Sequence, residues 1–231
     1  AQKKYLNRNM IERYTITASP ALVRERFATD VPDFYTPRYN ASPTQLLPVI
    51  TSADPAGISL FYWGETPGWA KNKTPGEKII NVRAETINEK VALKKALMKN
   101  RCIIPADGFY AWKRIGKKTV VPYRFVCADG LFSIPGLWEA YEDEQGQEMH
   151  TFSLFTIGSN PLVSAVQDRM PIIFNKAAEQ VWLHAQASER DLIALLDVHD
   201  GQGMSYYPVS PRISDIKTDV PSLITPTMPA D

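Results

Sequence analysis

A series of short apolar segments, separated by residues that favour turns, constrains the fold of this chain more than any other feature. The segments are a few residues long and mostly rich in β-branched and aromatic residues, which is typical of β-strands. Dipeptides such as Asp54-Pro55 and Asp129-Gly130 mark turns between them. We predict strands over residues 45–52, 58–65, 78–85, 102–113, 120–127, 131–140 and 150–157, with two more over 12–17 and 204–210.

Helices are predicted where the apolar residues change to a helical spacing behind a capping residue. Ser19 followed by Pro20 is a typical helix start. Asn175 can cap another helix, and Ser188 with Asp191 resembles a capping box. The predicted helices cover residues 20–28, 90–99, 175–185 and 188–197.

Many strands with a few helices predict a single α+β domain whose mixed β-sheet is curved and barrel-like and is flanked by those helices. No long linker and no internal repeat divides the chain. We assign residues 10–231 to this domain and residues 1–9, which are polar and basic without a period, to an N-terminal extension. The chain begins at Ala1 rather than Met, which leaves open whether the natural start was trimmed or processed.

Composition narrows the classes of function. A formal net charge of +1 argues against a globally basic nucleic-acid binder but allows a local basic cleft. No apolar run approaches the ~20 residues that span a membrane, and no signal-peptide pattern is visible, so we expect a cytoplasmic protein. Cys102 and Cys127 lie in strand-like segments, and the histidines have no metal-ligand spacing. We therefore expect buried thiols, no metal and no cofactor.

Six stretches of the chain, in order, resemble one protein family. MIERYTITASPALVRERF, followed by PRYNASPTQLLPVI, is similar to the opening of SRAP (SOS-response-associated peptidase) domains, and FYWGETPGWA resembles their Trp-Gly-x-x-Pro-x-Trp loop. IINVRAET is similar to the Asn-Ala-Arg-x-Glu-Thr strand, and CIIPADGFYAWK to Pro-Ala-Asp-Gly-Phe-x-Glu-Trp. VQDRMPIIF resembles the His-Asp-Arg-Met-Pro segment, and YYPVSPRI the closing strand. The resemblance covers roughly Met10 to the C-terminus.

The resemblance implies recognition of abasic sites in single-stranded DNA. In the family, an N-terminal cysteine exposed by removal of the initiator Met condenses with the sugar aldehyde to form a thiazolidine cross-link. An α-amine with a pKa near ~8 is more often neutral and nucleophilic at neutral pH than a lysine at ~10.4. A glutamate and a histidine manage the proton transfers, and an asparagine helps to position the site.

Three of these four positions carry a different residue in this chain. Ile11 stands at the cysteine position, and its nitrogen is an amide because residues precede it. Ala111 stands at the glutamate position. Gln167 replaces the histidine, and glutamine hydrogen-bonds but does not shuttle protons near neutral pH. Only Asn81 is retained, so the sequence predicts a catalytically degenerate member of the family.

The positions that the resemblance assigns to DNA contact are kept. Guanidinium groups suit phosphates because they are planar, always charged and bind two oxygens at once. The alternative for the arginines is pairing with carboxylates such as Asp168 or Glu85. Trp69 could stack on a base or anchor its loop, and Asn40 could approach the site or cap a local turn. The expected DNA contacts are Arg13, Asn40, Trp69, Asn81, Arg83, Thr156 and Arg169.

One hypothesis of function is favoured and two alternatives stay open. The favoured one is a monomer that binds single-stranded DNA, or a junction of single-stranded and double-stranded DNA, at abasic sites without cross-linking it. The second is an active cross-linking or lyase enzyme in which Lys3, Lys4 or the chain's own N-terminus forms a Schiff base; Cys102 as a replacement thiol is disfavoured by burial. The third is a cleft that binds a protein tail or a small ligand instead of DNA.

Overall fold

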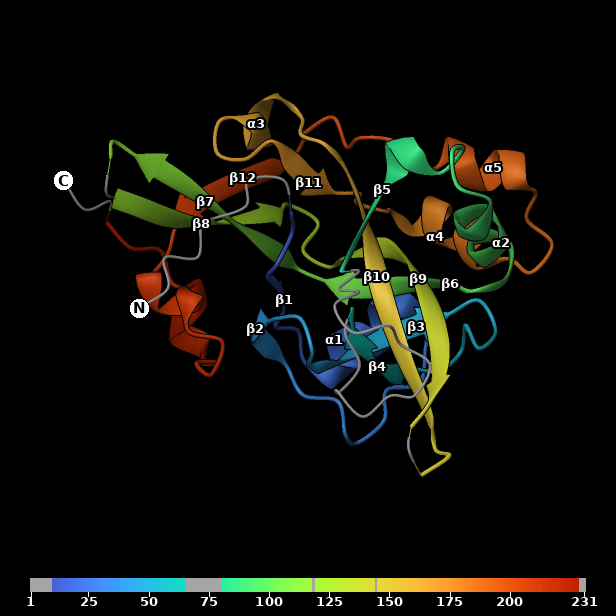
Figure 1. Ribbon diagram of the computed structural model, residues 1–231. Helices are drawn as coiled ribbons and strands as arrows, with labels where there is room; N and C mark the ends of the chain where they lie inside the picture. Colours follow the sequence, from blue (N-terminus) through green and yellow to red (C-terminus); the bar gives the residue numbers. More distant parts are fainter. Residues whose placement is uncertain (1–9, 65–79, 118, 144, 229–231) are drawn as a thin grey trace.

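The structure is a computed structural model that describes residues 10–64, 80–117, 119–143 and 145–228. Its centre is a closed barrel, because β10 pairs with both β4 and β9 and so completes the ring β10-β4-β3-β6-β9 (Figure 1). The sheet is mixed, since β10 runs parallel to β4 and antiparallel to β9. The barrel strands are β3 (Leu46–Thr51), β4 (Ser59–Trp63), β6 (Arg101–Ala106), β9 (Phe132–Glu142) and β10 (Glu148–Gly158). The predicted α+β, barrel-like architecture is confirmed.

Two short strands extend the barrel sheet along β10. One is β5 (Asn81–Arg83), which runs parallel to β10, and the other is β11 (Arg169–Pro171), which runs antiparallel to it. The segment at 78–85 was predicted as a longer strand, but its last residues form a 3₁₀ turn over Ala84–Thr86. The β11 strand was not predicted, because three residues are too few to show a period of two.

A second sheet packs beside the barrel in the order β12-β8-β7-β1-β2. The single strand predicted over 102–113 is two strands, β6 in the barrel and β7 in the second sheet, with Asp107 between them. The strands of the second sheet are β1 (Tyr14–Ile16), β2 (Arg38–Ala41), β7 (Gly108–Ile115), β8 (Thr119–Cys127) and β12 (Met204–Pro208).

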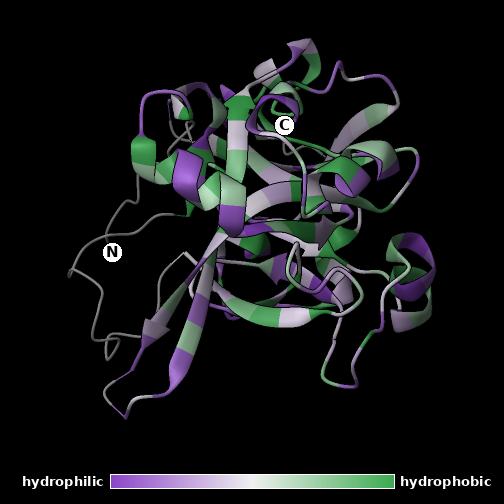
Figure 2. Ribbon diagram, turned by 90° about the vertical axis from the view of Figure 1, so that its right-hand side faces the viewer, coloured by the Kyte–Doolittle hydropathy of each residue, from purple (hydrophilic) through white to green (hydrophobic). Residues whose placement is uncertain are grey.

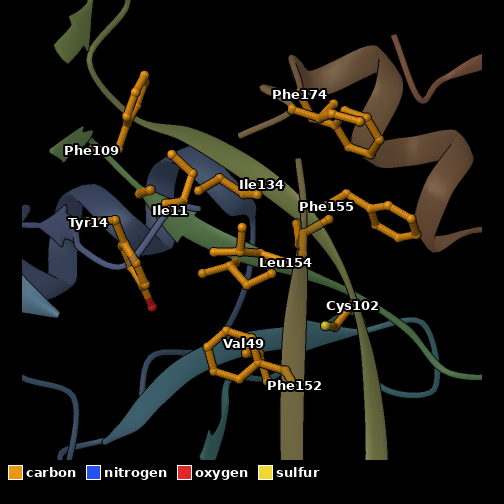
Figure 3. Packing of buried hydrophobic residues seen from close by; sticks show 14 of the residues in the cluster. Ile11, Tyr14, Val49, Cys102, Phe109, Ile134, Phe152, Leu154, Phe155 and Phe174 are labelled. Atoms are coloured by element: carbon orange, nitrogen blue, oxygen red, sulfur yellow. The ribbon is translucent and has the colours of Figure 1, made fainter. Parts of the chain in front are cut away.

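The barrel is filled by apolar side chains from strands far apart in sequence (Figure 3). Val49, Leu154 and Phe155 are fully buried. They belong to one continuous cluster with Trp63 and Trp182. Gly136 allows the close approach of neighbouring strands, because a Cβ there would lie 2.6 Å from Ser153 O and from Ile104 Cδ1. A side chain at this position would push the barrel wall apart.

Three of the predicted helices start at the predicted capping residues, whereas the one predicted over 90–99 has no side-chain cap. The side chains of Ser19, Asn175 and Ser188 each accept a hydrogen bond from a backbone N–H in the first turn. A further short helix, α3, was not predicted, although Asn160 caps it in the same way. The helices are α1 (Pro20–Phe27), α2 (Val91–Lys99), α3 (Pro161–Ser164), α4 (Lys176–Leu183) and α5 (Glu189–Ala194). Among the described residues, no helix is long and apolar enough to cross a membrane.

Candidate functional site

The residue at the cysteine position is held by the asparagine that the family motif retains. Asn81 Oδ1 accepts a hydrogen bond from the Ile11 backbone nitrogen at 2.7 Å, and Asn81 Nδ2 donates to the Ile11 carbonyl at 3.0 Å. The side-chain amide therefore pairs with Ile11 much as a neighbouring strand would. Both backbone groups of Ile11 are fixed by one side chain that is 70 residues away in sequence.

Gln167 also binds this segment. It follows α3 and is 2% exposed. Its Nε2 donates to the Met10 carbonyl at 3.3 Å and to the Arg169 carbonyl at 2.8 Å. Asn81 and Gln167 thus meet around residues 10 and 11. Both amide side chains bind backbone, and neither is a proton shuttle near neutral pH.

Ile11 and Ala111, which the resemblance places at the cysteine and glutamate positions, are buried apolar residues. Ile11 and Ala111 are both 0% exposed and belong to the main hydrophobic cluster. Figure 3 shows the Ile11 side chain between Phe109 and Ile134, with Tyr14 close by. Ala111 lies on β7, whose neighbouring residue Tyr110 donates its backbone N–H to the Arg13 carbonyl at 3.1 Å. The side chains of Ile11 and Ala111 are therefore packed as core.

Arg169 forms the ion pair that was the alternative to DNA contact. Its two terminal nitrogens lie 2.9 and 2.8 Å from the two carboxylate oxygens of Glu85, a bidentate geometry. The guanidinium also donates to the carbonyl and hydroxyl oxygens of Thr156. The hydrogen bonds from Arg169 lower the pKa of the Glu85 carboxyl below its ordinary value.

The other two arginines differ from Arg169. Arg13 is 8% exposed, and one of its terminal nitrogens donates to the Glu12 carbonyl at 2.8 Å. Within the described part of the chain, its Nε has no hydrogen-bond partner and its guanidinium pairs with no carboxylate. Burial lowers the pKa of Arg13, and the Glu12 carboxylate acts against that shift. Arg83 is exposed, and no salt bridge with a described carboxylate involves it.

Two of the expected DNA contacts are buried and bind other parts of the chain. Thr156 and Asn40 are both 0% exposed, so neither side chain is available at the surface in this conformation. Thr156 supports the guanidinium of Arg169. Asn40 Nδ2 donates to the carbonyls of Ile213, Asp215 and Thr218, which attaches the C-terminal segment to β2. Trp69 lies outside the described residues.

The sequence reasoning missed a polar network beneath β1. Asp107 accepts hydrogen bonds from the hydroxyls of Thr15 and Thr17, and the guanidinium of Arg124 lies 3.1 Å from its carboxylate. Gly108 makes room for this cluster, because a Cβ there would lie 2.8 Å from Arg124 Nε and 2.9 Å from Thr15 Oγ1. A lone acid inside the apolar run CIIPADGFYAWK was the available signal. Cys102 is fully buried, as predicted, and burial raises the pKa of its thiol, whereas Cys127 is only partly buried.

A closed mixed barrel beside a second sheet, with an asparagine on β5 holding the segment before β1, defines an SRAP domain. The SOS response associated peptidase (SRAP) family model matches residues 10–216, and the chain belongs to this family.

Similar proteins include the abasic site processing protein YoqW of Bacillus subtilis (strain 168), which is 36% identical over 221 residues, covering 93% of this chain and 99% of that protein. The abasic site processing protein YoaM of the same organism is 37% identical over 193 residues, covering 82% of this chain and 85% of that protein. Among solved structures, a protein from Bacteroides thetaiotaomicron is similar with a TM-score of 0.82 and 26% identity, covering 94% of this chain and 99% of that one.

Proposed function

We propose that this protein binds single-stranded DNA, or a junction of single-stranded and double-stranded DNA, at abasic sites and holds it without forming a covalent bond. The observation that carries the proposal is the state of Ile11, whose side chain is buried and whose backbone N–H is bound to Asn81. An amide nitrogen in this setting is no nucleophile, and isoleucine has no thiol to close a ring. The relatives named as abasic site processing proteins support the choice of DNA lesion.

The arginines support non-covalent binding of DNA. Arg83 is exposed at the end of β5, two residues from Asn81, and so stands next to the Ile11 segment. Arg13 is a nearly buried cation that forms no salt bridge with a described carboxylate, and an approaching phosphate would stabilise its charge. Arg169 is already paired with Glu85, so we assign it to joining β10, β11 and the turn that follows β5.

The test is an incubation with single-stranded DNA that carries one abasic site, followed by matched denaturing and native gels. We expect a shifted band on the native gel only. A band that survives denaturation would overturn the non-covalent mechanism, and its capture only with borohydride would identify a Schiff base on a substitute amine. No band on either gel would exclude DNA binding and favour a protein or small-molecule ligand.

A single substitution tests whether Arg83 contributes to DNA binding. Arg83→Ala should weaken binding to all sequences alike and should lower the slope of log K against log salt by about 1. Arg190→Ala, which removes an exposed arginine on α5, is the matched control. Monomeric state and cytoplasmic location stay predictions, and size-exclusion chromatography with light scattering tests the first.

A further inference from the structure

A pocket of about 330 Å³ lies between α2 and one face of the β9–β10 pair, and we call it the α2–β9 pocket. Leu137 and Glu139 of β9 stand opposite Ser153 and Thr151 of β10, so these four side chains share one face of the sheet. Figure 1 shows α2 to the right of the two strands. The volume is at the lower end of the range for small-molecule sites, about 300–1,000 Å³.

This pocket is separate from the segment around Ile11. Val82 of β5 lines the pocket, whereas the side chain of its neighbour Asn81 binds the backbone of Ile11. Successive side chains of a strand point to opposite faces. The pocket and the candidate DNA site are therefore on the two sides of β5.

The wall of the pocket contains a buried hydroxyl without a partner. Thr151 is 3% exposed, and its hydroxyl forms no hydrogen bond with any other described residue. The apolar part of the wall includes Leu93 and Ala96 of α2 and Leu137 of β9. Because buried polar groups are normally hydrogen-bonded, the free hydroxyl indicates a partner that enters the pocket.

The start of α2 supplies positive charge to the pocket. Lys90, directly before the helix, lines the pocket, is exposed and forms no salt bridge with a described carboxylate. No side chain caps this helix start. Its first backbone N–H groups therefore add to the positive potential of the lysine. An anionic group of a ligand would be stabilised here.

A carboxylate stands where β9 leaves the core. The strand is buried from Phe132 to Leu137, and Glu139 is exposed. Figure 2 shows mostly hydrophilic colours at the outer end of the β9–β10 hairpin. The hydroxyl of Tyr141 donates to the Glu139 carboxylate, which has further lone pairs to accept other donors. A ligand with an anion for Lys90 therefore also needs a hydrogen-bond donor for Glu139.

A nucleotide combines the groups that this pocket requires. Its phosphate suits a lysine at an uncapped helix start. Its base has flat faces that pack on apolar side chains. The amino group of adenine, cytosine or guanine donates to a carboxylate, whereas thymine presents an oxygen at the corresponding position of cytosine.

We propose that the α2–β9 pocket binds a nucleotide whose base carries an amino group. The phosphate lies at Lys90 and the start of α2, and the amino group donates to Glu139. The hydroxyls of Thr151 and Ser153 hydrogen-bond to the base or the sugar. The nucleotide is free in solution or belongs to a bound DNA strand, and the chemistry of recognition is the same for both sources. The site stands apart from the DNA binding proposed for the Ile11 segment.

The test is isothermal titration calorimetry of the full chain with dCMP, dTMP and deoxycytidine. We expect dCMP to bind, and the other two to bind on the order of tenfold more weakly. The reason is that dTMP has an oxygen in place of the amino group and deoxycytidine has no phosphate. Equal binding of dCMP and dTMP, or no binding of dCMP at millimolar concentration, would overturn the proposal.

Substitutions assign each group of the ligand to its side chain. K90Q should remove the advantage of dCMP over deoxycytidine, and E139Q should remove its advantage over dTMP. K95Q and E142Q, at exposed positions outside the pocket, are the matched controls and should change neither ratio. T151V should weaken dCMP binding several-fold, and if it lowers the melting temperature, the two exposed positions decide. A control that acted like its partner variant would mean that net charge, and not the pocket, governs binding.

Competition separates the two sources of the nucleotide. If single-stranded DNA with an abasic site displaces dCMP and E139Q weakens DNA binding, the nucleotide belongs to the bound strand. If both ligands bind together and E139Q leaves DNA binding unchanged, the nucleotide is free. Binding of dCMP without binding of DNA would refute only the function proposed above, and binding of DNA without binding of dCMP would refute only this inference.

Discussion

At the scale of single residues, the pairing of Asn81 with the Ile11 backbone is the contact on which the site depends. Replacing Asn81 with Ala removes both hydrogen bonds and leaves the partly buried N–H and C=O of Ile11 without these partners. We expect a loss of about 1–3 kcal/mol in the free energy of unfolding. Urea denaturation measures this loss, and N88A, at an exposed position, should leave it within about 0.5 kcal/mol.

Hydrogen exchange separates this contact from a general loss of stability. In N81A the Ile11 amide should lose protection selectively, while amides inside the barrel keep theirs. If the Ile11 amide stayed as protected as in wild type, Asn81 would not be what holds this segment.

The sequence predicted which residues meet at the site but not what each side chain does there. Ile11, Asn81 and Gln167 could be placed together because each lies inside a matched motif. The burial of Thr156 and Asn40 could not, because burial depends on strands and tails that pack from elsewhere. An asparagine before a turn can cap its own backbone, and only the path of the C-terminal segment shows that Asn40 binds that segment instead.

At the scale of elements, Arg101 joins the ends of two helices. This fully buried guanidinium donates to the carbonyls of Leu97 and Met98 at the end of α2, and to those of Trp182 and His184 at the end of α4. Helix C-termini leave such carbonyls without intrahelical partners. R101M should therefore destabilise the protein by roughly 3 kcal/mol or more.

The measurement for Arg101 is again the urea midpoint, with R114M as the control because Arg114 is exposed. R101K tests geometry against charge, since a lysine keeps the charge but not the planar fork of donors. If R101K had the same urea midpoint as wild type, charge alone would be enough to satisfy the carbonyls.

The C-terminal segment is a second element with a specific attachment. Asp219 Oδ1 accepts from the backbone N–H of Tyr39 and of Asn40, and the Asn40 side chain holds the segment from the opposite direction. N40A should cost about 2 kcal/mol and should make residues 209–224 cleavable by a protease while the barrel stays intact. Unchanged cleavage of this segment in N40A would show that its apolar contacts, Ile213 and Leu223 among them, suffice.

Helix starts could be predicted from sequence because caps are local, whereas strand partners could not. Asp107 illustrates the difference. The run from 102 to 113 has a continuous strand-like pattern, but it changes sheets at Asp107, where Thr15, Thr17 and Arg124 supply the partners of the carboxylate. Those partners lie 17 to 92 residues away in sequence, so no local window contains them.

At the scale of the whole molecule, a net charge of +1 conceals a local concentration of acids on the β9–β10 hairpin. The acidic β9–β10 hairpin includes Glu142 directly opposite Glu148, an arrangement of like charges that costs stability. We expect E142Q/E148Q to stabilise the fold slightly and to speed DNA association a few-fold at low salt, since the repulsion that keeps DNA from this side is removed. The gain should vanish at high salt, where charges farther apart than about a Debye length are screened. Stopped-flow fluorescence across a salt series measures the association rate.

E25Q/D33N, which changes the net charge equally at other exposed positions, is the control. Equal acceleration in both variants would mean that the total charge, and not the position of the acids on the β9–β10 hairpin, governs the approach of DNA.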